Sequence, residues 1–489
     1  MTKNLKQKTV SGLIWSFIET ISGQGIQFII GIILARLLTP HDFGLVGMLT
    51  VFIAISQSFV DSGFSQALIR KQNCKQDDYS TVFFFNLGIS VTVYTLLYFS
   101  SKHISAFFNE PLLESLLKVL GLGIILNSFS IVQKAILTKE LNFKLQTKVA
   151  IAASLISGVI SIYLAFIGCG VWSLVTLTLL RFGFTSFFLW FWSDWRPKRR
   201  FNSSSFKELF SFGSKLLLSG LIDTIYRNIY YVIIGKYFSV NQLGYYTRAD
   251  QFKIMSSQNI QSVVSRVSFP VLSSIQNDNY RLKLAYKKII RNTMLLTFMV
   301  MIGMAAIADS LIVTLIGDKW IPSVEYLQLL CFVGMFYPLH ALNLNILKVK
   351  GRTDIFLKLE VIKKIIAVPV ILIGIFYGIK NMIIAMIINS IIAYYLNSYY
   401  SGKLIGYNFK EQVKDVFPLF LLAFTISITV YGLGYCLQLS SVIMLILQIF
   451  VSIILYFCLF ELFKQKEYLY FKKIVIDKIS NYKNGRKKL

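Results

Sequence analysis

Ionisable side chains lie inside stretches of this sequence that are long and apolar enough to cross a lipid bilayer. They are Glu19, Asp61, Asp223, Arg227, Arg248 and Arg266. A charge at the bilayer centre costs roughly 2.5–3.5 kcal/mol on insertion scales, so it is retained where it faces a bundle interior or a hydrated cavity. Because charges of both signs occur at this depth, the sequence favours a protein that moves a polar substrate through lipid.

The stretch 241–273 carries too many polar residues for a helix that contacts only lipid. At 100° per residue, five of them fall within about 80° of one another: Arg248, Gln251, Asn259, Ser262 and Arg266. The two arginines are about 27 Å apart along the axis, one near each membrane surface. Snorkelling would explain the arginines but not the amides and hydroxyl between them. We interpret this polar stripe as a cavity-lining face that binds substrate.

The stretch 209–237 carries Lys215 near one end, with Asp223 and Arg227 near its middle. Asp223 and Arg227 are spaced i,i+4 and can form an ion pair. Two interpretations stay open. The pair is a buried structural salt bridge, or an anionic substrate competes with Asp223 for Arg227.

Carboxylates also occur in the first two apolar stretches, where Glu19 lies near the centre of 10–38 and Asp61 in the inner half of 43–69. A protonated carboxylate relaxes its hold on a neighbouring arginine. We therefore regard Glu19, Asp61 and Asp223 as candidate sites for a proton or sodium ion that biases a conformational cycle.

Composition places the whole chain in the membrane class. Of its 489 residues 55% are hydrophobic and 15% charged, whereas soluble domains carry about 25% charged residues. The net charge of +27 is better explained by basic cytoplasmic loops than by nucleic-acid binding. The sequence holds no phosphate-binding loop, no metal-ligand cluster and no CxxC pair. We expect no cofactor, no metal and no enzymatic activity.

Hydropathy predicts an all-α polytopic membrane protein with fourteen spans. They are 10–38, 43–69, 79–100, 113–137, 145–167, 171–192, 209–237, 241–273, 289–316, 323–347, 356–378, 380–402, 415–435 and 439–463. Most of the 50 lysines and arginines fall in alternate connecting segments, and the other connections hold only Lys102, Lys236, Lys319 and Lys380. This asymmetry predicts that both termini are cytoplasmic.

A faint internal repeat relates the two halves. Residues 35–44 (ARLLTPHDFG) end the first span and begin the second, and residues 235–244 (GKYFSVNQLG) do the same for the seventh and eighth. Six spans separate the copies, which predicts a parallel repeat of two six-helix lobes around a central cavity. We expect lobes at 1–200 and 201–408, two additional helices at 409–463 and a basic cytoplasmic tail at 464–489.

Several short motifs resemble those of the polysaccharide (O-antigen) flippases of the multidrug/oligosaccharidyl-lipid/polysaccharide exporter superfamily. They are residues 34–40 (LARLLTP) with 42–44 (DFG), 61–70 (DSGFSQALIR), 244–250 (GYYTRAD), 317–322 (GDKWIP) and 351–354 (GRTD). The resemblance runs from residue 1 to about 460. None of these motifs is catalytic, and their order together with the number of spans carries the likeness.

This resemblance implies a bacterial inner-membrane protein with two lobes in a V around a cavity that opens alternately to each side. It implies a substrate of undecaprenyl pyrophosphate carrying an oligosaccharide, for surface polysaccharide or lipopolysaccharide synthesis, and a glycan polymerase as a further candidate partner. The pyrophosphate would meet Lys215, Arg227, Arg248 and Arg266, because guanidinium groups suit phosphate oxygens. The sugars would contact Gln251, Asn259 and Ser262. By analogy with peptidoglycan-precursor flippases, the last two helices would hold the lipid tail.

Three other functions compete with this one. A cation-coupled multidrug exporter of the same superfamily would need a cavity that is more acidic or apolar. A glycan polymerase or transferase would need acid and base residues in an outer loop, where the segment 101–112 offers His103 and Glu110. A membrane scaffold would not need ionisable groups at mid-depth.

Overall fold

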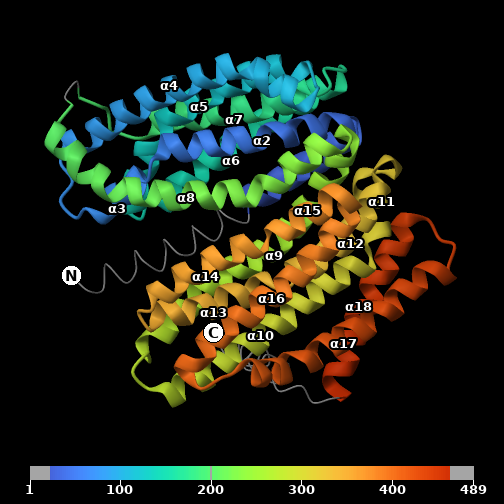
Figure 1. The fold of residues 1–489 in the computed structure, drawn as a ribbon. Coiled ribbons are helices and arrows are strands. Elements are labelled where there is room, and N and C mark those ends of the chain that lie inside the picture. Colours follow the sequence, from blue (N-terminus) through green and yellow to red (C-terminus); the bar gives the residue numbers. More distant parts are fainter. Residues whose placement is uncertain (1–21, 199–200, 463–489) are drawn as a thin grey trace, which may run out of the picture. The chain divides into compact units, whose positions relative to one another are not determined.

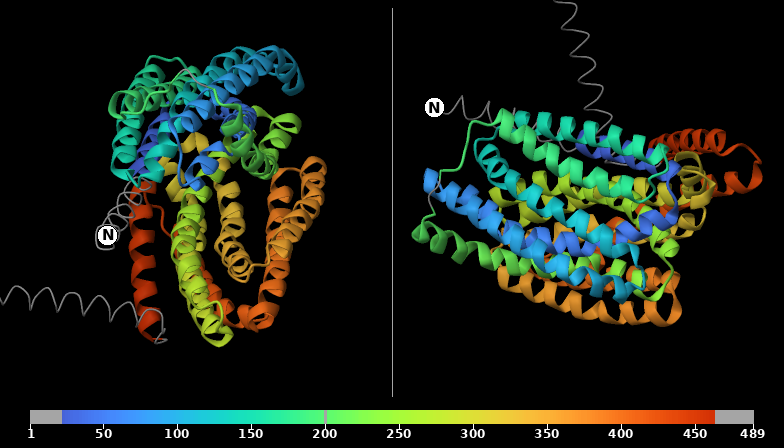
Figure 2. Two further views of the ribbon diagram at one scale, coloured as in Figure 1. Left: turned by 90° about the vertical axis from the view of Figure 1, so that its left-hand side faces the viewer. Right: turned by 90° about the horizontal axis from the view of Figure 1, so that it is seen from above.

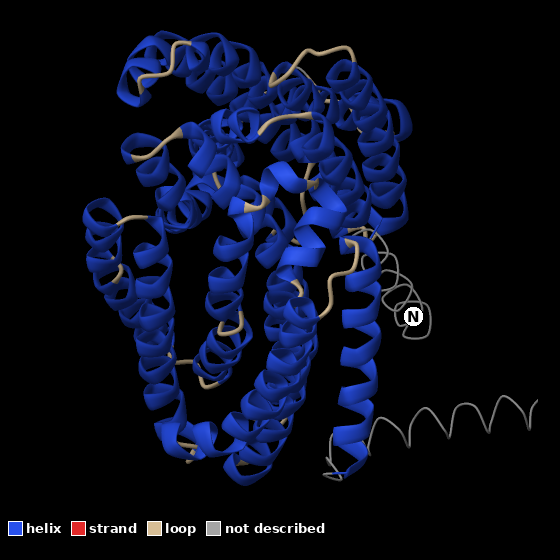
Figure 3. Ribbon diagram, turned by 90° about the vertical axis from the view of Figure 1, so that its right-hand side faces the viewer, coloured by secondary structure: helices blue, strands red, loops and turns tan. Residues whose placement is uncertain are grey.

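The computed structural model describes residues 22–198 and 201–462, and all regular structure in these ranges is helical (Figure 1 and Figure 3). Within them, 10 helical segments are long and apolar enough to cross a membrane. They are Pro40–Arg70, Gln76–Phe108, Leu112–Lys139, Phe143–Phe166, Trp172–Trp192, Asn279–Ala306, Pro322–Val349, Ile379–Ile405, Phe409–Cys436 and Ser441–Leu462. The prediction of an all-helical, polytopic membrane protein is confirmed, with ten of the predicted spans recovered.

Four predicted spans fall outside this set. The first is described only from Ser22 to Leu37, and Glu19 lies outside the described residues. The seventh and eighth are the 35-residue helices α8 (Ser203–Tyr237) and α9 (Val240–Ser274), in which polar residues lower the hydropathy. The eleventh is divided into α14 (Thr353–Ile366) and α15 (Val368–Tyr377). The count of fourteen stays a prediction.

The chain divides into two compact units, Met1–Thr247 and Arg248–Leu489, with the boundary inside α9. In the first unit, α4 (Gln76–Phe108) packs on α5 (Leu112–Lys139), and α6 (Phe143–Phe166) packs on α7 (Trp172–Trp192) (Figure 2). Helix α8 packs on α2 (Pro40–Asp61) and on α3 (Phe64–Arg70). A buried cluster that includes Phe64, Val82, Val132 and Leu209 joins α3, α4, α5 and α8.

In the second unit, α16 (Ile379–Ile405) packs on α15, α12 (Pro322–Gly334) and α13 (Tyr337–Val349). Helix α10 (Asn279–Ala306) lies along α17 (Phe409–Cys436), which also contacts α18 (Ser441–Leu462). The short helix α11 (Ala308–Ile316) packs on α18, and a 3₁₀ turn at Asp318–Trp320 follows it. Each unit is thus a helical bundle with its own core.

Several helices extend beyond the apolar stretches that predicted them. Helix α10 begins ten residues before position 289, because the Asp278 side chain caps it by accepting a hydrogen bond from the Arg281 amide at 3.0 Å. Helix α4 continues to Phe108, so the segment 101–112 is mostly helix rather than a loop. Hydropathy locates only the lipid-embedded part of a helix, whereas capping and packing decide where its ends lie.

The predicted repeat has a local structural counterpart. Thr39 and Asp42 form a capping box at the start of α2, and Ser239 and Gln242 exchange the same two hydrogen bonds at the start of α9. The two helix starts also meet. A Cβ atom on Gly44 would overlap the Val240 carbonyl oxygen, and one on Gly244 would overlap that of Pro40. The contacting residues are 196 and 204 positions apart in the chain, so the two copies of the short match lie against each other within the first unit.

Candidate functional site

Helix α9 has two polar faces that differ in burial. Asp250, Lys253, Ser257 and Ser268 are all at least 95% buried. At 100° per residue they fall on the side of the helix opposite the polar stripe predicted from the sequence. Helix α9 is therefore held in the second unit by polar as well as apolar side chains.

The buried face is built around an ion pair between Asp250 and Lys253, whose side chains are 8% and 4% exposed. The Lys253 Nζ atom lies 3.4 Å from the Tyr337 hydroxyl and 5.4 Å from the centre of its ring. Gly334 makes room for the lysine, because a Cβ atom there would lie 2.8 Å from the Lys253 Cγ atom. The pair thus joins α9 to α12 and α13 inside the second unit.

The Asp250–Lys253 pair was not predicted from the sequence. Its i,i+3 spacing is a signal for an ion pair on one helix face. Because polar residues also cover the opposite face of α9, periodicity alone did not show which face is packed.

The predicted stripe lies outside this packed core. Arg248, Gln251, Asn259 and Ser262 are half-buried and Arg266 is exposed. The Ser262 hydroxyl donates to the Asn259 carbonyl at 3.0 Å. The stripe therefore offers side chains that packing within the second unit does not bury.

On α8 the predicted basic residues Lys215 and Arg227 are exposed, and Asp223 between them is half-buried. The neighbouring Thr224 hydroxyl lies 3.1 Å from that of Ser58 on α2, so this part of α8 is in contact with α2. Whether Asp223 serves as a structural or a functional partner of Arg227 stays a prediction.

Asp61 is the last residue of α2, where the helix breaks before α3. The break consists of Ser62 and Gly63 in the left-handed region, with φ of 47° and 69°. The Ser65 hydroxyl donates to the half-buried Asp61 carboxylate. A Cβ atom on Gly63 would lie 2.5 Å from the Gly213 carbonyl oxygen, so the break packs tightly on α8. This geometry anchors Asp61 beside α8 within the first unit.

The candidate residues are thus distributed over both units. Asp61, Lys215, Asp223 and Arg227 lie in the first, and Arg248, Gln251, Asn259, Ser262 and Arg266 in the second. Their convergence on one cavity stays a prediction. Among the residues that the structure describes, no group of three or more His, Cys, Asp or Glu side chains is placed to hold a metal ion.

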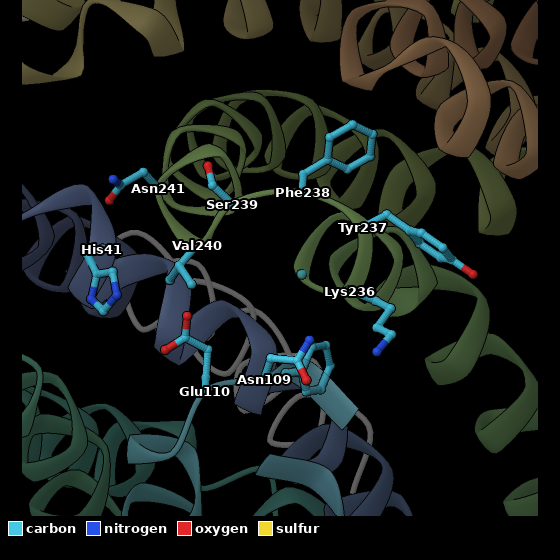
Figure 4. A pocket seen from close by; sticks show the side chains of 11 residues that line it. His41, Asn109, Glu110, Lys236, Tyr237, Phe238, Ser239, Val240 and Asn241 are labelled. Carbon is cyan, nitrogen blue, oxygen red and sulfur yellow. The ribbon is translucent and has the colours of Figure 1, made fainter. Parts of the chain in front are cut away.

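A pocket of about 350 Å³ lies at the turn between α8 and α9 in the first unit (Figure 4). Its lining includes His41 from α2, Glu110 after α4, Lys236 from α8 and Asn241 from α9. The Lys236 Nζ atom donates to the Phe107 carbonyl at 2.5 Å, at the end of α4. In this segment the sequence indicated only the short repeat, and no pocket was predicted there.

Comparison with known proteins matches residues 33–325 to the family described as "Polysaccharide biosynthesis protein". Lipopolysaccharide biosynthesis protein WzxC of Escherichia coli (strain K12) is 24% identical over 89% of each chain. Succinoglycan biosynthesis transport protein ExoT of Rhizobium meliloti (strain 1021) is 25% identical over 65% of each. The solved structure of the lipid II flippase MurJ in an inward closed conformation superposes with a TM-score of 0.75 at 16% identity, covering 94% of this chain and 99% of that one. The last likeness shows the fold alone.

Proposed function

Since the chain belongs to the polysaccharide biosynthesis protein family, we propose that it flips an undecaprenyl-pyrophosphate-linked oligosaccharide from the cytoplasmic to the periplasmic leaflet. The chain is a multi-pass membrane protein of polysaccharide transport with the exporter-superfamily fold, as its motifs predicted. Substrate, direction and alternating access belong to the proposal. So do the fourteen spans, the lobes at 1–200 and 201–408, the added helices at 409–463, the tail at 464–489 and the cytoplasmic termini.

The observation that carries the proposal is the division of α9 into two polar faces. The charges of Asp250 and Lys253 are neutralised within the second unit. The stripe of Arg248, Gln251 and Asn259 is only half-buried, so these side chains keep part of their surface open to a ligand. A hydrated cavity that admits a phosphorylated sugar would solvate polar groups of this kind on a membrane helix.

In the proposed complex each polar group has a chemical role. The guanidinium groups of Arg227, Arg248 and Arg266 and the Lys215 ammonium would bind the pyrophosphate oxygens. The amides of Gln251 and Asn259 and the Ser262 hydroxyl would hydrogen-bond to sugar hydroxyls, while the polyprenyl tail stays in lipid. Glu19, Asp61 and Asp223 are the proposed sites for a coupling proton or sodium ion.

The rival function is a cation-coupled multidrug exporter, which shares the fold. Family membership favours the glycan, because the match is to polysaccharide biosynthesis proteins. The stripe also brings arginines, which suit an anionic headgroup better than a cationic drug.

Arg248→Ala tests the proposal directly. Proteoliposomes containing the full chain would be loaded with a fluorescent lipid-linked oligosaccharide, and its exposure to an outside quencher would be measured. We expect flipping to fall roughly 10- to 100-fold, in line with the loss of a hydrogen bond to a charged group. Arg281→Ala, which removes an arginine whose side chain is 77% exposed, is the matched control. Normal flipping by Arg248→Ala at equal protein level would contradict the proposal.

Asp223→Asn tests ion coupling. If Asp223 carries the coupling ion, its amide variant should lose the dependence of flipping on pH or sodium while still binding substrate. Unchanged dependence on both would remove Asp223 from the coupling role.

A further inference from the structure

A second pocket, of about 620 Å³, lies entirely within the second unit between α11, α12, α17 and α18. It includes residues next to the 317–322 and 437–440 connections, which the distribution of basic residues predicts to lie on the outer side. Its lining combines the acids Asp309 and Glu325, the aromatic residues Tyr431 and Tyr435, and the apolar residues Leu437 and Met444. The proposed flipping function uses none of these groups.

Gln448, one of the residues that line this pocket, carries a buried acceptor without a partner among the described residues. Its side chain is 3% exposed, and its Nε2 atom donates to the Val430 carbonyl at 3.2 Å. Gly434 permits this approach, since a Cβ atom there would lie 3.1 Å from Nε2. The Gln448 Oε1 atom is buried and has no hydrogen-bond partner in the part of the chain that the structure describes. A buried acceptor without a partner is unfavourable, so this atom favours a ligand that brings an N–H or O–H donor.

The charge of the pocket points to the same kind of ligand. The residues that line it in the described structure include two carboxylates and no lysine or arginine. Glu325 pairs at 2.5 Å with Lys380, which is not among the lining residues, whereas Asp309 is exposed and has no ion pair among the described residues. The rings of Tyr431 and Tyr435 can also attract a cation over their faces. The ligand should therefore carry positive charge.

The surroundings indicate that the ligand also has an apolar part. Tyr431 and Tyr435 lie at the outer end of α17, where aromatic side chains commonly mark the headgroup level of a bilayer. Beside the pocket, the first turns of α18 expose Val442, Ile443 and Ile446, which are 53%, 56% and 64% exposed. An acyl chain could lie along this face while its headgroup occupies the pocket.

We propose that this pocket binds the primary ammonium headgroup of an outer-leaflet phospholipid. The ammonium lies between the Asp309 carboxylate and the Gln448 carbonyl, to which its N–H groups donate, and the acyl chains lie against α18. This site does not depend on the identity of the transported glycan.

Lipid selectivity tests the chemistry of the headgroup. The full-length protein would be reconstituted in equimolar phosphatidylethanolamine, phosphatidylcholine and phosphatidylglycerol, extracted gently, and its bound lipids counted by native mass spectrometry. Phosphatidylcholine has the charge without N–H donors, and phosphatidylglycerol has no ammonium. We expect phosphatidylethanolamine to be retained roughly fivefold better than phosphatidylcholine or phosphatidylglycerol, because the site would recognise both the positive charge and the N–H donors. Equal retention of the three lipids would overturn the proposal.

Two variants separate the two contacts. Asp309→Asn should lower retention of both ammonium lipids, whereas Gln448→Leu should reduce the preference for phosphatidylethanolamine over phosphatidylcholine, because the Asp309 carboxylate is then the remaining acceptor. Glu110→Gln, which removes a carboxylate from the pocket at the α8–α9 turn, is the matched control and should change neither. If Gln448→Leu fails to fold, Asp309→Asn decides, because Asp309 is exposed and its replacement removes no core packing. Unchanged selectivity in Asp309→Asn would refute the site.

Competition distinguishes a lipid headgroup from other ligands. Dodecylamine should displace bound phosphatidylethanolamine, while dodecanol and free ethanolamine at the same concentration should not. Displacement by dodecanol or by a neutral oligosaccharide would show that the charge is not recognised. Displacement by ethanolamine as effective as that by dodecylamine would show that the apolar stem is not recognised. Either result would overturn the assignment to a phospholipid.

Discussion

The two polar faces of α9 carry similar residue types in different surroundings. On one face Asp250 and Lys253 neutralise each other in a site closed by Gly334 and Tyr337. On the other face, the side chains of the stripe that begins with Arg248 range from half-buried to exposed. They do not belong to the core of the second unit. Charge within a membrane helix therefore does not by itself identify a substrate site. Burial separates a structural ion pair from groups that remain accessible to a ligand.

The largest expected effect is on the buried face. Lys253→Met leaves the Asp250 carboxylate buried without its cation, and breaking a buried pair costs about 3–5 kcal/mol. Thermal unfolding of the purified protein in detergent measures the loss. Adding Asp250→Asn should recover most of the stability, because the uncompensated charge is then removed. If Lys253→Met alone were as stable as the parent protein, the ion pair would not contribute to the stability of the fold.

A substitution in the polar stripe should have a smaller effect, and it should change the rate of transport rather than the stability of the protein. Arg248→Lys keeps the charge but loses the planar fork that can bind two phosphate oxygens. We expect flipping to fall by roughly three- to fivefold, less than in Arg248→Ala, with the free energy of unfolding unchanged within about 0.5 kcal/mol. A loss of stability comparable to that of Lys253→Met would erase the distinction between the two faces.

Tyr337→Phe examines how much the third member of the buried site contributes. The variant removes the hydroxyl that lies 3.4 Å from the Lys253 Nζ atom and keeps the ring beneath it. Stability should fall by about 1 kcal/mol, the size of one hydrogen bond, with transport preserved. A loss as large as that of Lys253→Met would show that the hydroxyl, rather than Asp250, is the main partner of the lysine.

The smallest effect is expected at an exposed ion pair outside the membrane spans. Lys71 lies 2.9 Å from Glu208, with side chains 24% and 62% exposed. Burial works to lower the pKa of Lys71, but hydrogen bonds to Glu208 and Asp78 outweigh it and raise the pKa above its ordinary value of 10.5. The pair therefore contributes fully below pH 10.5, and its contribution is lost as pH rises through the higher folded-state pKa.

Glu208→Gln should accordingly cost less than about 1 kcal/mol at pH 7 and 9, and the difference from the parent should shrink at pH 11. Unfolding at the three pH values checks both statements. A difference that grows with pH would contradict the direction of the Lys71 shift.

Hydropathy and periodicity predicted much of the fold and one part of the candidate site, the polar stripe on α9. The apolar stretches predicted the ten membrane-spanning helical segments, because lipid requires long apolar helices. The 100° rotation per residue identified the stripe on α9, and the motifs predicted the family that the comparison confirmed. The short sequence match around Gly44 and Gly244 marked two segments whose helix starts pack against each other in the structure. The parallel repeat itself stays a prediction.

Other features depended on contacts between residues far apart in the chain. Lys253 is an ordinary polar residue in a polar helix until Gly334 and Tyr337 of other helices enclose it. The Gln448 amide nitrogen is bound by the Val430 carbonyl of α17, while its buried Oε1 atom has no hydrogen-bond partner among the described residues. The order of residues sets which side chains share a helix face, since the helical repeat is local. Which face becomes buried depends on the helix that packs against it, and that is a property of the tertiary structure.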